Sequence, residues 1–283
     1  MHIANAHSRT DLDDAAMEPP LVDVHAHIYR MDMPMQSSAW HRPVRDATVE
    51  EYLATLDAAG VRYGVLAAAS IYGDYNDYML AAIRDHDRLR ATVIVDPDTD
   101  PYILRMMKED GVVGIRLQFR NVETPPDLSS YPYQKLLRRV ADLDWHVHLH
   151  DEGDRLPQHI SHIEMAGPRL VIDHFGRPAA EDGVNSVGFQ AVLRSVARGR
   201  TWVKLSGAFR IEPPGAARQL AQALLRDAGP ERLLWGSDWP FAAFEDRMTY
   251  ADTLAQYREN VADAATRRAI DQTAMQFYFD RDQ

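Results

Sequence analysis

This chain of 283 residues has no cysteine, which excludes disulfide bonds, thiolate metal ligands and a cysteine nucleophile. It has no apolar run of about 18 residues and no basic segment followed by an apolar one at its start, so neither a membrane span nor a secretory signal is expected. The patterns G-x-G-x-x-G and G-x-x-x-x-G-K-[ST] are also missing, which argues against a nucleotide cofactor. These absences favour a cytoplasmic protein.

The chain also has fewer basic than acidic residues. The chain has 31 Lys and Arg against 42 Asp and Glu, a net charge of −11. That balance argues against a nucleic-acid partner or an anionic membrane surface, both of which favour a basic patch. A small anionic molecule can still bind wherever arginines are gathered locally. The composition says nothing about whether the protein is a monomer or a homo-oligomer.

Apolar runs alternate with amphipathic segments eight times along the chain. We expect strands over residues 21–27, 62–69, 91–95, 112–119, 145–150, 169–174, 201–206 and 232–237. We expect helices over residues 48–59, 75–86, 101–109, 131–143, 155–165, 186–197, 214–227 and near 245–258, with a last one over 263–279. Thr48 and Glu51 form a capping-box pattern at the first helix, and Gly60 marks its end.

This alternation predicts a single (β/α)8 TIM barrel over residues 21–283 with an extra C-terminal helix, a fold that usually needs about 250 residues. Residues 1–20 are expected to form a short flexible arm. An open doubly wound sheet is the alternative, but its ligands bind at one switch point. It would not need functional side chains at the ends of the first, fifth, sixth and eighth strands.

Four apolar runs, far apart in the sequence, do end in such side chains. They are LVDVHAH at 21–27, WHVHLH at 145–150, LVIDH at 170–174 and LLWGSD at 233–238. Because the carboxyl ends of barrel strands meet at one mouth, these residues predict a single site and a hydrolytic enzyme.

Alternation along each strand indicates which side chains reach the mouth. Asp23, His25 and His27 are expected to share one face, so that both histidines can reach one metal ion or one substrate oxygen. In the fifth strand His150 is nearest the mouth. His146 is expected at the closed end or in the barrel, and His148 as a packed or supporting residue.

The sixth and eighth strands supply a histidine and an aspartate. His174 is expected to polarise a carbonyl or to move a proton, whereas Asp173 is expected to point the other way and to support a loop. Asp238, between two tryptophans, is the candidate general base. Arg116 and Arg120 lie at the end of the fourth strand and Arg210 follows the seventh. They could grip a substrate carboxylate, or could simply tie the barrel together.

The D-x-H-A-H, I-D-H-F-G-R-P and L-W-G-S-D-W-P stretches, in this order, resemble the amidohydrolase superfamily over about residues 20–280. In particular they resemble its metal-independent lactonase branch, typified by 2-pyrone-4,6-dicarboxylate lactonase. The resemblance implies a barrel that opens a lactone ring with water. It implies Asp238 as the general base, His25, His27 and His174 as groups that polarise the carbonyl, and Arg116 and Arg210 as carboxylate anchors.

Two departures from that branch matter. His150 stands where the decarboxylase-like relatives have a zinc ligand, so His25, His27, His150 and Asp238 could hold one zinc ion with a position left for water. Phe241 and Ala243 follow the W-P pair where the dicarboxylate lactonase has polar residues, so another lactone is expected as the substrate. Arg116 and Gln118 leave no lysine for a binuclear metal centre at the end of the fourth strand.

Three functions remain in competition. The favoured one is a lactonase for a small anionic lactone, with or without one zinc ion. A mononuclear zinc-dependent decarboxylase or hydratase would use the same ligands, and a barrel that only binds is the third. Loops at 29–47, 70–76, 119–130 and 175–186 would select the substrate through residues drawn from Trp40, His41, Tyr72, Tyr75 and Tyr131, of which His41 and Tyr72 are the preferred candidates.

Overall fold

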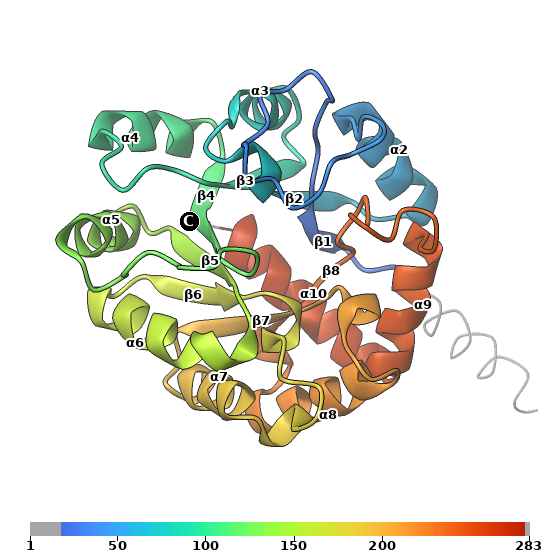
Figure 1. Ribbon diagram of the computed structural model, residues 1–283. Coiled ribbons are helices and arrows are strands. Elements are labelled where there is room, and N and C mark those ends of the chain that lie inside the picture. Colours follow the sequence, from blue (N-terminus) through green and yellow to red (C-terminus); the bar gives the residue numbers. More distant parts are fainter. Residues whose placement is uncertain (1–17, 281–283) are drawn as a thin grey trace, which may run out of the picture.

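Eight parallel strands form a barrel in the computed structural model, which describes residues 18–280 (Figure 1). The strands are β1 (Val22–Ala26), β2 (Tyr63–Ala67), β3 (Leu89–Val93), β4 (Val112–Gln118), β5 (His146–His150), β6 (Arg169–Ile172), β7 (Thr201–Ser206) and β8 (Leu233–Gly236). They pair in chain order. Backbone bonds of 2.8 Å from Asp238 N to His25 O and from His27 N to Trp239 O close the barrel between the last strand and the first.

A helix follows each strand and packs on the outside of the sheet (Figure 1). These helices are α2 (Val49–Ala59), α3 (Asp77–Asp85), α4 (Pro101–Glu109), α5 (Tyr131–Asp142), α6 (Leu156–Ala166), α7 (Val187–Ala197), α8 (Ala216–Ala228) and α9 (Tyr250–Asn260). An additional helix, α10 (Ala264–Tyr278), ends the described chain. The predicted TIM barrel with an extra C-terminal helix is confirmed. Residues 1–17 of the predicted arm lie outside the described residues.

Several predicted boundaries differ from the observed ones, most by one or two residues, and β3 and α9 are two examples. β3 begins two residues earlier than expected, because Leu89 belongs to the same buried run as Ala91 and Val93. α9 begins at Tyr250 and not near residue 245. Thr249 forms a capping box there with Asp252, and this local hydrogen bonding fixes the start of the helix.

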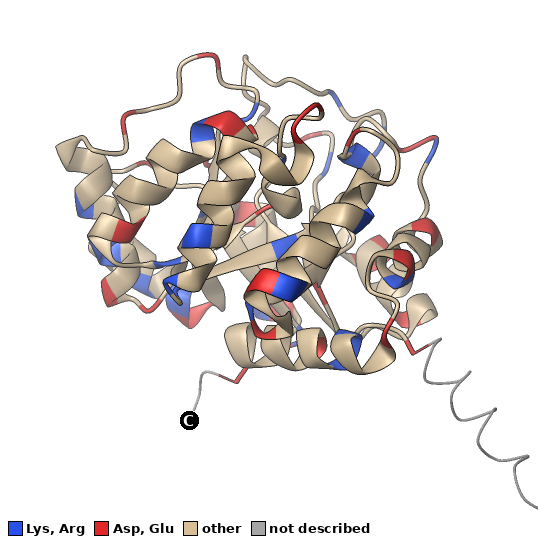
Figure 2. Cartoon of the chain, turned by 90° about the horizontal axis from the view of Figure 1, so that it is seen from below, with Lys and Arg blue, Asp and Glu red and all other residues tan. Residues whose placement is uncertain are grey.

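Apolar side chains close one end of the barrel. Val22 and Val24 of β1 pack in one cluster with Phe277 and Tyr278 of α10. Seen from the side, the helix that leads to the C terminus covers this end, and long loops gather at the other (Figure 2). A site formed by the polar residues at the strand ends can therefore open only at the C-terminal mouth of the barrel. Within residues 18–280, no helix has the length and apolarity needed to span a bilayer.

Candidate active site

β1 brings two histidines to the mouth through an irregular backbone. The register with β2 shifts between Asp23 and Ala26, so strict alternation breaks inside the strand. His25 points into the barrel, and its Nε2 lies 3.2 Å from His27 Nε2. Asp23 does not share their face, which corrects the prediction from spacing: its carboxylate accepts hydrogen bonds from Ser237 N and Oγ, at 2.8 and 2.6 Å.

β6 supplies two site residues where one was expected. Asp173 follows the strand in extended conformation, so alternation carries its side chain inward, and the prediction that it points away is wrong. His174, Phe175 and Arg177 then adopt positive φ angles of 49°, 57° and 39°. Such backbone is costly for residues other than glycine, by about 1–3 kcal/mol each. This turn brings both His174 and Arg177 to the cavity at the C-terminal mouth of the barrel.

Asp238 follows β8, and glycines allow the backbone to approach closely around it. A Cβ at Gly236 would lie 2.5 Å from His25 Cβ, so a glycine is required where these strands approach. Gly207 has φ +59°, and a Cβ there would lie 2.8 Å from His174 Nδ1. Both glycines give His25, His174 and Asp238 the room to converge.

Three ligand atoms meet at the centre of the mouth. Asp238 Oδ1 lies 3.6 Å from His25 Nε2 and 3.5 Å from His27 Nε2, and the two nitrogens are 3.2 Å apart. Ligand atoms around a tetrahedral zinc ion, with bonds of about 2.0–2.1 Å, are separated by about 3.3–3.4 Å. The spacing in the mouth therefore suits one metal ion.

The hydrogen bonds of His25 and His27 indicate the same tautomer for both rings. His27 Nδ1 lies 2.7 Å from Ala67 O, and His25 Nδ1 lies 3.2 Å from Asp173 Oδ1. Both of these oxygens only accept, so the hydrogen bonds to them require a hydrogen on each Nδ1 and leave a lone pair on each Nε2. Two nitrogen lone pairs and a carboxylate oxygen then face one another with no hydrogen-bond donor between them. Three such electron-pair ligands are suited to a cation.

His150 lies apart from this triangle. Its ring centroid is 4.7 Å from that of His174, and neither of its nitrogens has a hydrogen-bond partner within the described residues. It lines the same cavity and is 8% exposed. His146 packs at the closed end, 5.2 Å from the ring of Phe277.

A buried polar network lies beneath the triangle. Asp173 Oδ1 contacts His25 Nδ1, His148 Nε2 and, at 3.6 Å, the ammonium of Lys204. Its Oδ2 lies 3.5 Å from Arg116 Nη2. His148 is thus a supporting residue, as predicted. The roles of Lys204 and Asp173 were missed, although the inward alternation of each strand was the signal that could have found them.

Burial and ion pairing set the charges of these groups. Burial lowers the pKa of His25, His27 and His150, and takes that of His174 to about 4, so these histidines are neutral near pH 7. Burial raises the pKa of Asp238, but Arg210 and His174 outweigh it and hold that pKa well below its usual range.

The same balance applies in the network beneath. Burial raises the pKa of Asp173, but His148 and His25 outweigh it and hold that pKa well below its usual range. Burial lowers the pKa of Lys204 to about 8. The site therefore contains two ionised aspartates in contact with neutral imidazoles.

Arginines surround the cavity above the triangle. Arg210 Nε lies 2.5 Å from Asp238 Oδ2, and Arg116 Nη1 donates to Ala68 O at 2.6 Å. Arg120 Nε lies 2.9 Å from Glu152 Oε1. The cavity is lined by His27, Tyr29, Trp40, His41, Ala69, Ser70, Ile71, Arg116, Gln118, Arg120, Asn121, His150, His174, Arg177, Arg210, Asp238, Pro240 and Ala242. Four of these residues are arginines, so the cavity suits an anion although the protein is acidic.

The predicted loop residues divide into two groups. Trp40 and His41 line the cavity, and His41 Nε2 lies 2.9 Å from Glu245 Oε1. Tyr72 does not line it, which corrects the prediction: the Tyr72 hydroxyl donates to Arg30 O at 3.2 Å and its ring packs on Tyr29. Tyr29 takes the place at the cavity that was expected for Tyr72.

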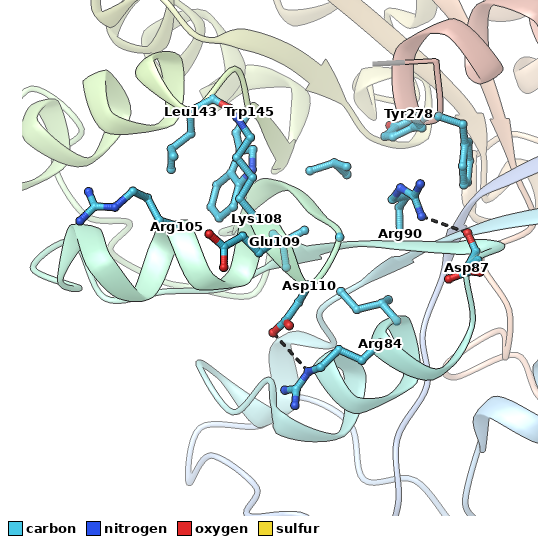
Figure 3. A pocket seen from close by; sticks show the side chains of 15 residues that line it. Arg84, Asp87, Arg90, Arg105, Lys108, Glu109, Asp110, Leu143, Trp145 and Tyr278 are labelled. Carbon is cyan, nitrogen blue, oxygen red and sulfur yellow. Dashed lines mark hydrogen bonds and ion pairs between the residues drawn. The ribbon is translucent and has the colours of Figure 1, made fainter. Parts of the chain in front are cut away.

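A second hollow lies at the opposite end of the barrel, where β3, β4 and β5 begin (Figure 3). Charged side chains such as Arg105 and Lys108 surround it, and Arg84 Nε pairs with Asp110 Oδ2 at 3.2 Å (Figure 3). Trp145 and Tyr278 lie against its inner part. None of the buried histidines lines this hollow, and barrel enzymes use the other face. The candidate active site is therefore the C-terminal mouth.

Comparisons with known proteins agree with this geometry. The sequence profile of a family described as Amidohydrolase matches residues 22–279. The chain is 30% identical to 4-sulfomuconolactone hydrolase of Hydrogenophaga intermedia over 237 residues, covering 81% of this chain and 78% of that protein. It is 28% identical over 262 residues to 2-pyrone-4,6-dicarboxylate hydrolase of Comamonas testosteroni, covering 86% and 84%. A probable 2-pyrone-4,6-dicarboxylic acid hydrolase from Acinetobacter baumannii, solved with citric acid bound, superposes with a TM-score of 0.87 at 30% identity, covering 92% and 99%.

Proposed function

Because this chain belongs to the amidohydrolase family, we propose that it hydrolyses a small lactone that carries a carboxylate or a comparable anion. The observation that carries the proposal is the meeting of Asp238 with three histidines beneath a cavity ringed by arginines. Relatives of similar length whose names describe lactone hydrolysis support the same reaction.

Asp238 acts as the general base in this proposal. It takes a proton from the water that attacks the lactone carbonyl carbon, and it returns a proton to the ring oxygen when the ring C–O bond breaks. His174 Nδ1 lies 2.9 Å from Ser206 Oγ. A hydroxyl that donates to this nitrogen leaves Nε2–H free to bond the carbonyl oxygen, which becomes negative during attack.

Arg210 links substrate charge to the base. In the free protein its Nε is bonded to Asp238 Oδ2, which keeps that carboxylate a weak base. An anionic substrate that shares Arg210 weakens this pair and makes Asp238 more basic. The probable hydrolase from Acinetobacter baumannii was solved with citric acid bound, so a protein of this fold at 30% identity binds an anionic molecule.

We further propose that His25, His27 and Asp238 hold one zinc ion, because their ligand atoms face one another at 3.2–3.6 Å with no donor between them. Bound zinc supplies a Lewis acid and lowers the pKa of water. The unpartnered nitrogens of His150 make it the candidate for a further ligand from the cavity side.

Replacing the general base tests the proposal. Asp238→Asn should lower kcat on an anionic lactone by at least about 10²-fold, the usual scale for losing a general base. Its circular dichroism spectrum should match that of the wild type. Near-normal turnover by a folded Asp238→Asn variant would exclude Asp238 as the base.

A further inference from the structure

The buried network beneath the mouth contains a carboxylate that the proposed reaction does not use. We propose that Asp173 is a positioning residue, which holds His25 in the Nδ1–H form and thereby keeps the His25 Nε2 lone pair available for zinc. This inference rests on the proposed zinc site and goes beyond it, because it assigns a function to a residue that touches neither the substrate nor the ion.

The hydrogen bonds around Asp173 have fixed directions. Asp173 is 1% exposed, and its Oδ1 lies 3.2 Å from His25 Nδ1 and in shorter contact with His148 Nε2. An ionised carboxylate only accepts, so both nitrogens must carry hydrogens. Thr92 Oγ1, 3.1 Å from His148 Nδ1, must then donate to that nitrogen. The contacts of Asp173 and Thr92 are therefore consistent with one proton arrangement.

Lys204 makes the carboxylate necessary. Its ammonium lies 3.3 Å from His25 Nδ1 and 3.1 Å from His148 Nε2, and an ammonium only donates. Without a carboxylate to accept the histidine protons, Lys204 would donate to His25 Nδ1 instead. The imidazole would then carry its hydrogen on Nε2, and a protonated nitrogen cannot bind a metal. Asp173 and Lys204 therefore compete for the same nitrogen, and Asp173 prevails in the wild type.

Side-chain ¹H–¹⁵N correlation spectra of the metal-free protein report the position of this hydrogen, with His25→Gln used to assign the signal. The wild type should show His25 with hydrogen on Nδ1. Asp173→Asn should move it to Nε2 and weaken zinc binding by about 10- to 100-fold in a chelator competition, the usual loss when a ligand's outer partner is removed. The double variant Asp173→Asn/Lys204→Met should recover part of that affinity, because the competing donor is gone.

Asp151→Asn is the matched control. Asp151 is also 1% exposed and follows the neighbouring strand β5, but it accepts from His159 and Arg155 and does not contact His25. It should leave the His25 tautomer and the zinc affinity unchanged. If Asp173→Asn does not fold, the wild-type spectrum still decides: hydrogen on His25 Nε2 overturns the inference. An Asp173→Asn variant with wild-type tautomer and zinc affinity overturns it as well. Absence of zinc binding by the wild type would instead refute the proposed metal site, while the spectrum still tests the tautomer.

Discussion

Arg210 makes the most informative single substitution, because it touches both the cavity and the general base. Its Nε–Oδ2 bond to Asp238 is 2.5 Å long, and its guanidinium lies 4.8 Å from the ring centroid of Phe209 and 5.1 Å from that of Phe244. Methionine can keep an apolar contact with these rings but carries no charge. Arg210→Met should therefore remove one charge-assisted contact to an anionic lactone, worth about 1.5–3 kcal/mol, or roughly 10- to 150-fold in KM.

The same substitution should change the pH profile. Arg210 is the strongest of the groups that lower the pKa of Asp238, so its removal raises that pKa. The base is active when ionised, and the acid limb of kcat/KM should accordingly move to higher pH. Initial rates between about pH 4 and 9, on an anionic lactone and on a neutral one, measure both effects.

Arg177→Met provides the comparison for Arg210→Met. Arg177 lines the same cavity but pairs with Glu152, at 3.7 Å, and not with Asp238. It should weaken the binding of anionic lactones and leave the acid limb in place. The reasoning fails if Arg210→Met gives an unshifted acid limb, or if it reduces activity on charged and neutral lactones equally.

Three other substitutions test separate parts of the structure. Burial raises the pKa of Asp271 to about 7, above its unfolded value, so its stabilising contribution is present below about pH 4 and is lost as pH rises to 7. Asp271→Asn keeps an acceptor for Leu21 N and should unfold at higher urea concentration than the wild type at pH 8, with the difference shrinking at pH 5; a pH-independent difference would contradict this. His150→Ala should lower the zinc content measured by elemental analysis, whereas unchanged zinc and activity would leave His150 as a cavity-lining residue only. Gly236→Ala should displace His25 and reduce kcat at least about tenfold, and full activity would refute the close approach of β8 to β1.

The barrel could be predicted from the sequence because the strands are apolar runs and several helices have end signals, as in the capping box of Thr48 and Glu51. The convergence of His25, His27, His174 and Asp238 on one mouth also follows from parallel strands ending together.

The details that were missed depend on backbone irregularities and distant contacts. A shift in register at β1 separates Asp23 from His25, and nothing in the spacing of these residues shows it. At β6 the prediction assumed that only one of Asp173 and His174 could face inward. The left-handed turn lets both do so. Lys204 was overlooked because alternation along β7 could place it inward but could not show its partners, which come from other strands.

The preference of the enzyme for charge on an otherwise identical lactone is the most direct test of the proposed function. The measurement is kcat/KM of the wild-type protein for a small carboxylate-bearing lactone and for its methyl ester, with ring opening followed in both cases. One lost charge-assisted contact predicts a preference for the free acid of roughly 10- to 150-fold. Equal rates on the two lactones, or no ring opening of any anionic lactone by the zinc-loaded protein, would contradict the account.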